Sequence, residues 1–309
     1  MGLGMVDSVA RGEPRDNRAE LKFSFCSSTA GTRNGVREAA ARDQLRLVRN
    51  VFCLLVAIIW TPLMGAAALL AMLVTFNRSS SMIVAQRWWS PVMLWAGGAT
   101  LEVSGLENLS KGQPYIFVSN HQSTIDIPTL FLAIPWDVRF VAKKALKYVP
   151  VMGWYMWAAK FPFVDRTNHR DAVRSLDAAG AQIRGGISII VFPEGTRSGD
   201  RRVQPFKKGP FALAMKARVP VVPVTIEGSG TLMPKNSWQI TPGLIRVRVG
   251  KPIAPEHFEA DQALLIREVR DRIIDQSLAL GGLGGDKDDS VAARGLEGVS
   301  SRSANHPGK

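Results

Sequence analysis

The chain has 309 residues, of which 46% are apolar, and a formal net charge of +13. This length permits one large domain or two ordinary ones, and the two cysteines, Cys26 and Cys53, argue against a disulfide framework or a thiolate metal site. The positive charge gathers in residues 137–218, where 16 Lys and Arg residues stand against 6 Asp and Glu residues. Such a field favours an anionic partner: phosphate, nucleic acid or a bilayer surface.

The first predicted elements are a polar tail and a membrane anchor. Residues 1–36 are polar and lack periodicity, which predicts a disordered tail. Residues 51–76 carry no charge, and as a helix they would be about 39 Å long, more than the roughly 30 Å of a hydrocarbon core. A buried core helix is the weaker alternative for so long a run. We therefore predict a membrane-anchoring helical segment over residues 37–99.

The topology of this anchor stays open at the level of sequence. Pro62 interrupts the apolar run, so a kinked span and a re-entrant hairpin are both possible. A second segment, 82–99, carries tryptophans and one arginine that suit the headgroup layer. If 51–76 crosses once, the rest of the protein lies outside. If 51–76 is re-entrant, or 82–99 returns, the rest is cytoplasmic. The arginines upstream of the run favour a cytoplasmic start in either case.

Residues 100–278 alternate between strand and helix patterns, which predicts an α/β catalytic domain. We expect a mixed, largely parallel sheet flanked by helices, with the active site where strands end. The expected strands are 101–104, 115–119, 138–142, 187–192, 220–226 and 244–250. The expected helices are 126–133, 144–158, 169–184, 207–217 and 256–277. Residues 279–309 open with a glycine-rich run and are predicted to be a disordered tail.

The first motif places a histidine and an aspartate after a buried strand. The run 115–119 is rich in β-branched and aromatic residues, and His121 follows at its exit. Imidazole can take and return a proton near neutrality. Asp126, five positions on, could hold the ring as in a catalytic dyad that lacks its own nucleophile. The alternative is that Asp126 only caps the helix that begins near Pro128.

The second motif ends another buried strand in the turn 193–198. Pro193 ends the strand ladder and Gly195 permits a tight turn, which places Glu194 and Arg197 at the same sheet edge as His121. The arginine fork suits a phosphate, and successive N–H groups can form an anion nest. The alternative is a surface ion pair between Glu194 and Arg197.

Taken together, these motifs resemble the signature blocks of the glycerolipid acyltransferases, and most closely the 1-acyl-sn-glycerol-3-phosphate acyltransferases. Four ordered blocks within residues 100–250 carry the resemblance, although relatives with different acceptors share them. The blocks are Asn120-His121-Gln122-Ser123 with Asp126, Phe161-Pro162-Phe163-Val164-Asp165-Arg166, Phe192-Pro193-Glu194-Gly195-Thr196-Arg197-Ser198 with Pro205-Phe206-Lys207-Lys208-Gly209, and Val221-Val222-Pro223-Val224.

The resemblance implies the reaction and its partners. A fatty acyl group would pass from acyl-CoA or acyl carrier protein to the sn-2 hydroxyl of lysophosphatidic acid, making phosphatidic acid in phospholipid biosynthesis. The partners would be the membrane bilayer, the acyl donor and the lysophospholipid acceptor, with no cofactor. Independently of the resemblance, the sequence has no histidine, cysteine and carboxylate cluster at metal spacing, so we expect no metal, and the apolar anchor argues against a nucleic-acid partner. The enzyme would lie at the cell membrane with its catalytic domain on the cytoplasmic face.

The resemblance also assigns roles to residues. His121 would be the general base, with Asp126 holding its other ring nitrogen; Ser123, as a nucleophile beside His121, is the rival, although we expect it to cap the helix or orient Asp126. The phosphate of the acceptor would be bound by Arg166 and Arg197. Glu194 would orient the glycerol hydroxyls or Arg197, and Gly195 and Thr196 would supply hydrogen-bond donors.

Two features keep alternatives of their own. Lys207 and Lys208 are expected to be a solvated cationic face rather than ligands of the donor's phosphates or of an anionic bilayer. Residues 152–157 are expected to form a core or interface helix, and the alternative is a helix on the bilayer that lines an acyl-chain tunnel.

Other functions remain as alternatives. A related acyltransferase with another acceptor, such as glycerol 3-phosphate, a lyso-phospholipid or a lyso-aminolipid, would share all these motifs. A membrane lipid-ester hydrolase would need water in place of the acceptor, and the missing Gly-x-Ser-x-Gly elbow argues against it. A lipid-binding scaffold would leave the strand-end motifs unexplained, and a nucleic-acid binder would leave the apolar anchor without a role.

Overall fold

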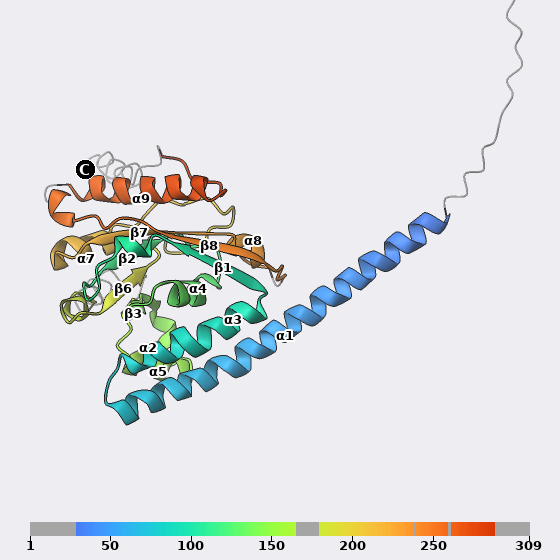
Figure 1. Ribbon diagram of the computed structural model, residues 1–309, viewed down its shortest axis with the longest axis horizontal. Coiled ribbons are helices and arrows are strands. Elements are labelled where there is room, and N and C mark those ends of the chain that lie inside the picture. Colours follow the sequence, from blue (N-terminus) through green and yellow to red (C-terminus); the bar gives the residue numbers. More distant parts are fainter. Residues whose placement is uncertain (1–28, 165–178, 238, 259–260, 288–309) are drawn as a thin grey trace, which may run out of the picture. The chain divides into compact units, whose positions relative to one another are not determined.

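The computed structural model describes residues 29–164, 179–237, 239–258 and 261–287 (Figure 1). The chain divides into two units, Met1–Gln44 and Leu45–Lys309. The whole α/β fold and every contact discussed below belong to the second unit.

A six-stranded sheet forms the centre of this unit, in the order β1-β8-β7-β2-β6-β3. Neighbouring strands are parallel except for the antiparallel pair β7 and β8. The strands are β1 (Ala99–Ser104), β2 (Ile116–Ser119), β3 (Val138–Phe140), β6 (Ser188–Val191), β7 (Val221–Glu227) and β8 (Gly243–Val249), and β4 (Ala142–Lys143) with β5 (Phe163–Val164) forms a separate parallel pair. The predicted mixed, largely parallel sheet is confirmed.

The three central strands explain where the two motifs meet. Strands β7, β2 and β6 are buried along their whole length, as expected for Val- and Ile-rich strands with helices on both faces. Val118 of β2 pairs with Val191 of β6 on one side and Pro223 of β7 on the other, so β2 and β6 end nearly level, whereas β7 continues to Glu227. Asn120 closes this edge, because its side chain bonds both the N–H and the C=O of Ile226, at 2.8 and 2.9 Å.

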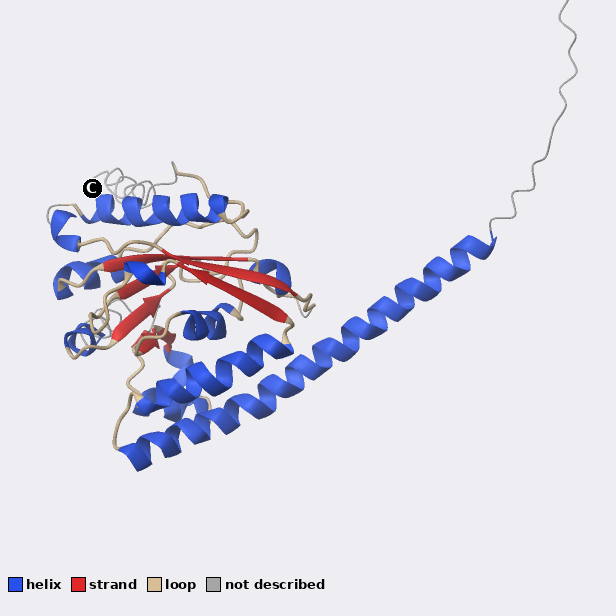
Figure 2. Cartoon of the chain, viewed as in Figure 1, coloured by secondary structure: helices blue, strands red, loops and turns tan. Residues whose placement is uncertain are grey.

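Helices cover both faces of the sheet (Figures 1 and 2). One face packs on α4 (Asp126–Ala133), α3 (Ser90–Ala96) and α5 (Met152–Ala158), and the other on α7 (Gly209–Ala217) and α9 (Gln262–Ala279). In α9 the predicted apolar stripe of Leu265, Val269 and Ile273 is buried. Asp261 begins α9, because its Oδ1 accepts from the N–H groups of Ala263 and Leu264.

Several short elements complete the fold and refine the predicted boundaries. The predicted helix 144–158 is split into a 3-10 helix, Lys144–Tyr148, and α5, because Pro150 between them has no N–H to donate. Of the predicted helix 169–184, residues 179–184 are helical and residues 169–178 lie outside the described part. The remaining short helices are Leu106–Asn108, α8 (Ser229–Leu232) and Pro255–Phe258.

The anchor segment is a helical hairpin. Helix α1 (Thr29–Thr75) continues through Pro62, and after the turn at Phe76 the chain returns through α2 (Ser80–Val84), a π-helical turn (Ala85–Trp89) and α3. Hydrogen bonds join the two arms, among them Cys53 Sγ to Ala96 O at 2.8 Å, Trp60 Nε1 to Trp88 O at 3.2 Å, and Trp89 Nε1 to Thr61 Oγ1 at 3.1 Å. Segment 82–99 therefore returns alongside segment 51–76.

The start of α1 corrects one predicted boundary. Residues 1–36 were expected to form a disordered tail, yet α1 already begins at Thr29. A helix nucleated by the apolar run extends at little cost, since each added residue gains a hydrogen bond.

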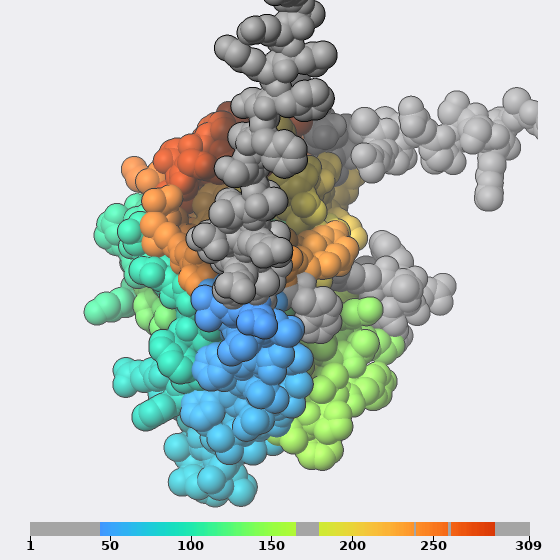
Figure 3. All heavy atoms as spheres, turned by 90° about the vertical axis from the view of Figure 1, so that its right-hand side faces the viewer, coloured from blue at the N-terminus to red at the C-terminus, as the bar shows by residue number. Residues whose placement is uncertain are grey.

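The hairpin and α5 carry an apolar surface, which we call the apolar face. Within α1, Gln44–Thr75 is the one helix of the described residues that is long and apolar enough to cross a membrane, and only 17% of its most apolar window is buried. A core helix would be mostly buried, so this exposure associates the protein with a membrane. Figure 3 shows α1 in blue between the teal α2–α3 arm and the yellow-green region of α5. The exposed side chains of the apolar face include Leu55, Ile58, Ile59, Leu63, Leu70, Ile83, Trp88, Trp95, Tyr148, Trp154 and Trp157.

Candidate active site

The site is built on the two loops that leave β2 and β6. His121 follows β2, and its Nδ1 lies 2.8 Å from Oδ2 of Asp126. The side chain of His121 is 15% exposed and that of Asp126 is fully buried, so the pair forms at the edge of the site. The contact that the predicted dyad requires is present, and because Nδ1 is held by Asp126, Nε2 is the other ring nitrogen of the imidazole.

Asp126 also shapes the loop around the histidine. Its Oδ2 accepts hydrogen bonds from the backbone N–H groups of Gln122 and Ser123, at 2.8 and 2.9 Å. Asp126 stands at the start of α4, as the capping alternative requires, but its oxygen turns back to the preceding loop. The carboxylate therefore fixes both the ring of His121 and the backbone that carries it.

Ser123 does not serve as the nucleophile of the dyad in this geometry. Its hydroxyl donates to the carbonyl of Met233 at 2.7 Å, and the residue is fully buried. The backbone N–H of Ser123, rather than its hydroxyl, reaches Asp126. Ser123 thus holds the loop, in agreement with the expected orienting role.

The second motif meets the first through Phe192 and Glu194. The ring of Phe192 stacks on the imidazole of His121, with centroids 3.9 Å apart and planes 13° apart, and Phe192 in turn stacks on Phe140. Oε1 of Glu194 accepts the backbone N–H of His121 at 3.2 Å. The carbonyl of His121 accepts the N–H of Ser198 at 2.7 Å. The two loops are therefore one structural unit.

Glu194 is a buried acid, which rules out the surface ion pair. It is 6% exposed, and burial, reinforced by the charge of Asp126, raises the pKa of its carboxyl well above the usual value. The N–H of His121 opposes this shift. Because Oε1 of Glu194 bonds the backbone N–H of His121, Glu194 fixes the position of that residue.

Arg197 and its neighbours form the more open side of the turn. Nη1 of Arg197 donates to the hydroxyl of Thr124 at 2.9 Å, and Thr196 is exposed. Gly195 has a φ of +77°, and a side chain there would come within 2.8 Å of Nζ of Lys207. Lys207 thus lies against the turn although it is exposed, which its sequence position alone did not indicate.

The structure brings together His121, Asp126, Glu194, Gly195, Thr196 and Arg197 from the predicted site. The other predicted phosphate ligand, Arg166, lies outside the described residues. Sequence reasoning assigned no role to Phe192 or Thr124. Phe192 belongs to the second motif, yet only the pairing of β2 with β6 reveals that its ring faces His121.

Comparisons with known proteins agree with this geometry. A family model described as acyltransferase matches residues 100–227. The chain is 35% identical over 219 residues to a 1-acyl-sn-glycerol-3-phosphate acyltransferase of Saccharomyces cerevisiae, covering 70% of this chain and 72% of that protein. It is 36% identical over 271 residues to the chloroplastic 1-acyl-sn-glycerol-3-phosphate acyltransferase BAT2 of Brassica napus, covering 84% and 75%.

A solved structure shares the fold. The crystal structure of the 1-acyl-sn-glycerophosphate (LPA) acyltransferase PlsC from Thermotoga maritima superposes with a TM-score of 0.70 at 29% identity, covering 78% of this chain and 98% of that one. The fold and the site thus define an acyltransferase. The chain belongs to the 1-acyl-sn-glycerol-3-phosphate acyltransferase family.

Proposed function

We propose that the protein transfers a fatty acyl group from a thioester donor, acyl-CoA or acyl carrier protein, to the sn-2 hydroxyl of lysophosphatidic acid. The product is phosphatidic acid. The observation that carries the mechanism is the 2.8 Å contact between His121 Nδ1 and Asp126 Oδ2 beside the turn that bears Arg197. The relatives named above support the choice of acceptor.

The chemistry needs a base for a weak nucleophile. Nε2 of His121 takes the proton of the acceptor hydroxyl while its oxygen attacks the thioester carbonyl carbon. Asp126 stabilises the imidazolium that forms, as the carboxylate of a triad does. The carbon–sulfur bond then breaks, and the proton passes from Nε2 to the departing thiolate. The substrate's own hydroxyl is the nucleophile, so no acyl-enzyme forms.

The acceptor's phosphate is bound by arginines in this proposal. Arg197 is held toward the start of α4 by Thr124, and its remaining N–H groups suit a phosphate in two-pronged geometry. Gly195 and Thr196 add backbone and hydroxyl donors, and Arg166 is the second proposed cation. Glu194 keeps the turn in register with His121 through its bond to the backbone.

The hairpin supports a location for the catalytic residues. Because segment 82–99 returns beside segment 51–76, both ends of the hairpin lie on one side of the bilayer if the hairpin inserts. We propose that residues 37–99 anchor the protein in this way, that residues 100–278 carry catalysis, and that this part lies on the cytoplasmic face, where the positive charge around Arg46 and Arg49 belongs.

An acceptor panel tests the function. Purified protein in detergent is given labelled acyl-CoA or acyl carrier protein together with lysophosphatidic acid, glycerol 3-phosphate, lysophosphatidylcholine or a lyso-aminolipid. We expect the fastest transfer to lysophosphatidic acid. A higher kcat/KM with one of the other acceptors would overturn the assignment, and release of free fatty acid without an acceptor would indicate a hydrolase.

A further inference from the structure

The proposed base, His121, lies between two residues whose side chains are tied to the end of β7. Before it in the chain, Asn120 bonds both backbone groups of Ile226, at 2.8 and 2.9 Å. After it, Gln122 donates from Nε2 to Oε2 of Glu227 at 3.2 Å. Glu227 is the last residue of β7, and the proposed function gives this acid no role.

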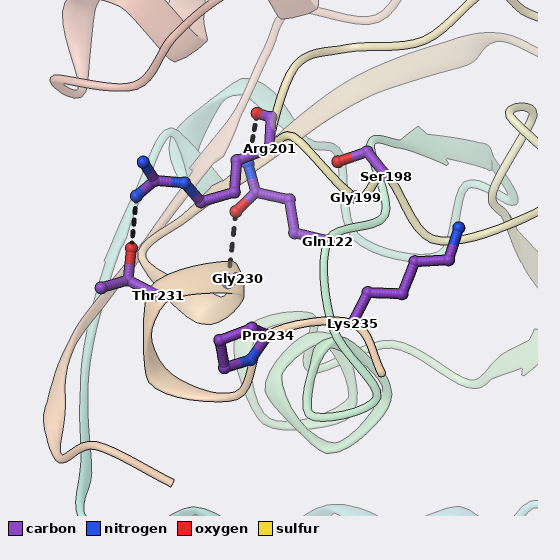
Figure 4. A pocket seen from close by; sticks show the side chains of 8 residues that line it. All are labelled: Gln122, Ser198, Gly199, Arg201, Gly230, Thr231, Pro234 and Lys235. Carbon is purple, nitrogen blue, oxygen red and sulfur yellow. Dashed lines mark hydrogen bonds between the residues drawn. The ribbon is translucent and has the colours of Figure 1, made fainter. Parts of the chain in front are cut away.

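The hydrogen bonds of Gln122 fix its side chain in one orientation. The residue is 2% exposed. Its Nε2 also donates to the carbonyl of Arg201 at 3.2 Å, and its Oε1 accepts the N–H of Gly230 at 3.3 Å. Figure 4 shows this amide between the loop of Arg201 and the turn of Gly230. Turning the amide over would set its NH2 group against an N–H and its oxygen against two acceptor oxygens. Glu227 must therefore present an acceptor to Gln122.

The other carboxyl oxygen of Glu227 is held by α9. The hydroxyl of Ser277 donates to Oε1 of Glu227 at 2.6 Å, and the same hydroxyl oxygen accepts the N–H of Gly284 at 3.1 Å. Ser277 is fully buried and Glu227 is 8% exposed. Both oxygens of Glu227 thus accept from donors whose own positions are fixed, as buried polar groups require.

The turn that follows α9 closes over this acid. A side chain at Gly282 would come within 2.3 Å of Cδ of Glu227, so only glycine lets the chain pass there. The carbonyl of Gly284 accepts the N–H of Val203 at 2.8 Å, which joins the turn to the loop that carries Arg201. Glu227 is therefore enclosed by β7, α9 and this turn, with Gln122 on its remaining side.

Gln122 links Glu227 to the dyad. The backbone N–H of Gln122 donates to Oδ2 of Asp126 at 2.8 Å, and the same oxygen lies 2.8 Å from Nδ1 of His121. A shift of Gln122 would therefore move the residue next to His121 and weaken a bond that holds Asp126. Since a displacement of about 1 Å can cost on the order of 10²-fold in rate, the placement of Gln122 bears on the reaction.

We propose that Glu227 and Ser277 are positioning residues for the general base. Ser277 orients the carboxyl group of Glu227, and Glu227 fixes Gln122 in the one orientation that holds the backbone beside His121. Both residues act through Gln122 rather than on the substrate. The inference rests on the proposed function, because it takes His121 as the base. It extends the site beyond the two motifs, to the end of β7 and to α9.

Three substitutions in the full-length protein separate positioning from stability. Ser277→Ala removes the donor to Oε1, and Glu227→Gln leaves one acceptor oxygen for two donors. Thr225→Val is the matched control. Thr225 is fully buried on β7, and its hydroxyl donates to Oε1 of Gln276 in α9 at 2.8 Å. The control thus removes a hydrogen bond between the same strand and the same helix without affecting Gln122.

Steady-state kinetics give the first test. We expect Glu227→Gln and Ser277→Ala to lower kcat about tenfold, with the KM values for donor and acceptor changed less than about twofold. Ser277→Ala adds and removes no charge, so a loss shared by the two variants follows from geometry. Thr225→Val should keep its kcat even if its melting temperature falls as far. Unchanged kcat in both variants, or an equal loss in Thr225→Val, would overturn the proposal.

A nuclear magnetic resonance measurement reports on the position of the ring without turnover. The imidazole of His121 stacks on Phe192 with centroids 3.9 Å apart, so the ring current of Phe192 makes the Hε1 resonance of His121 sensitive to small displacements. The signal is assigned by its loss in His121→Ala. Spectra are compared in detergent, without substrate, on the alkaline plateau of the histidine titration, where a change in protonation does not contribute.

The expected shifts distinguish the variants. Glu227→Gln and Ser277→Ala should shift the Hε1 resonance of His121 and leave that of the exposed His257 in place. Thr225→Val should shift neither. Because no reaction is needed, this result holds even if lysophosphatidic acid is not the acceptor or His121 is not the base. An unchanged His121 resonance in both variants would overturn the proposal.

Discussion

The backbone N–H of His121 donates to Oε1 of Glu194 at 3.2 Å, so the acid of the second motif holds the histidine of the first. The contact is partly buried and joins residues far apart in sequence. It makes the placement of the base depend on the turn that carries Arg197, and the predictions below separate the contributions of these residues.

Replacing the base should remove the chemistry. His121→Ala is expected to lower kcat on the order of 10³-fold, because the hydroxyl of the acceptor loses the group that takes its proton. The initial rate of phosphatidic acid formation measures the effect, and the melting temperature shows whether the protein still folds. Near-normal turnover in a folded variant would rule out His121 as the general base.

Asp126 has two roles that two substitutions can separate. Asp126→Asn keeps an oxygen for the N–H groups of Gln122 and Ser123 but loses the charge that stabilises the imidazolium, so kcat should fall about 10²- to 10³-fold with little change in melting temperature. Asp126→Ala removes the loop bonds as well and should lower both. If Asp126→Asn lost activity only in proportion to its stability, the residue would be a loop support rather than part of the dyad.

Arg197 should act on the binding of the acceptor. Arg197→Ala is expected to raise the KM for lysophosphatidic acid about tenfold or more while the donor KM changes little, because a charge-assisted contact to the phosphate is lost. The control is Arg246→Ala, which removes a half-exposed arginine of β8 paired with Glu102 of β1. Equal loss of turnover with uncharged and phosphate-bearing acceptors would contradict the assignment.

The raised pKa of Glu194 predicts a pH dependence of stability. In the pH range between its unfolded pKa and its higher folded pKa, the folded state binds more protons than the unfolded state, so this group makes stability fall as pH rises. Glu194→Gln cannot titrate. Its melting temperature relative to the unsubstituted protein should therefore increase from pH 5 to pH 8.

A thermal-unfolding series in one detergent across this pH range measures the difference. Glu227, whose pKa is also raised, contributes equally to both proteins and cancels. A relative melting temperature that stayed constant would show that folding leaves the pKa of Glu194 unchanged, and one that fell with pH would show that the folded state favours the charged carboxylate.

The apolar face should be covered by lipid. Trp154 of α5 is 60% exposed and Leu264 of α9 is 51% exposed, so the two positions are matched in exposure on opposite faces of the sheet. In vesicles, a membrane-impermeant maleimide should label Trp154→Cys much more slowly than Leu264→Cys. Equal labelling of both variants in vesicles would place α5 in water.

Local patterns predicted most of the fold. Short apolar runs predicted strands β2, β6 and β7, and the spacing of Leu265, Val269 and Ile273 predicted α9. Each of these patterns depends only on which side chains of that one element are buried. The break in the predicted helix 144–158 followed from Pro150, a signal present in the sequence. The early start of α1 had no such signal, since helix extension depends on the stability of the run that follows.

The site was predicted in part, because its residues stand directly after predicted strands. His121, Asp126, Glu194 and Arg197 stand at strand ends, and parallel strands bring their ends to one edge. The stacking of Phe192 on His121 depends on side-chain packing between loops, which no periodicity records. The roles proposed for these residues, and for Arg166, stay predictions.

The hairpin bonds have a consequence for any attempt to make a water-soluble form of this enzyme. Cys53 of α1, Met82 and Leu94 of the returning arm, and Phe117 and Phe140 of the sheet belong to one hydrophobic cluster. Deleting α1 would leave the carbonyls of Trp88 and Ala96 without their side-chain donors and would strip the cover from that cluster. Helix α1 is thus part of the hydrophobic core beneath the sheet, and a chain shortened by this helix would expose that core to water.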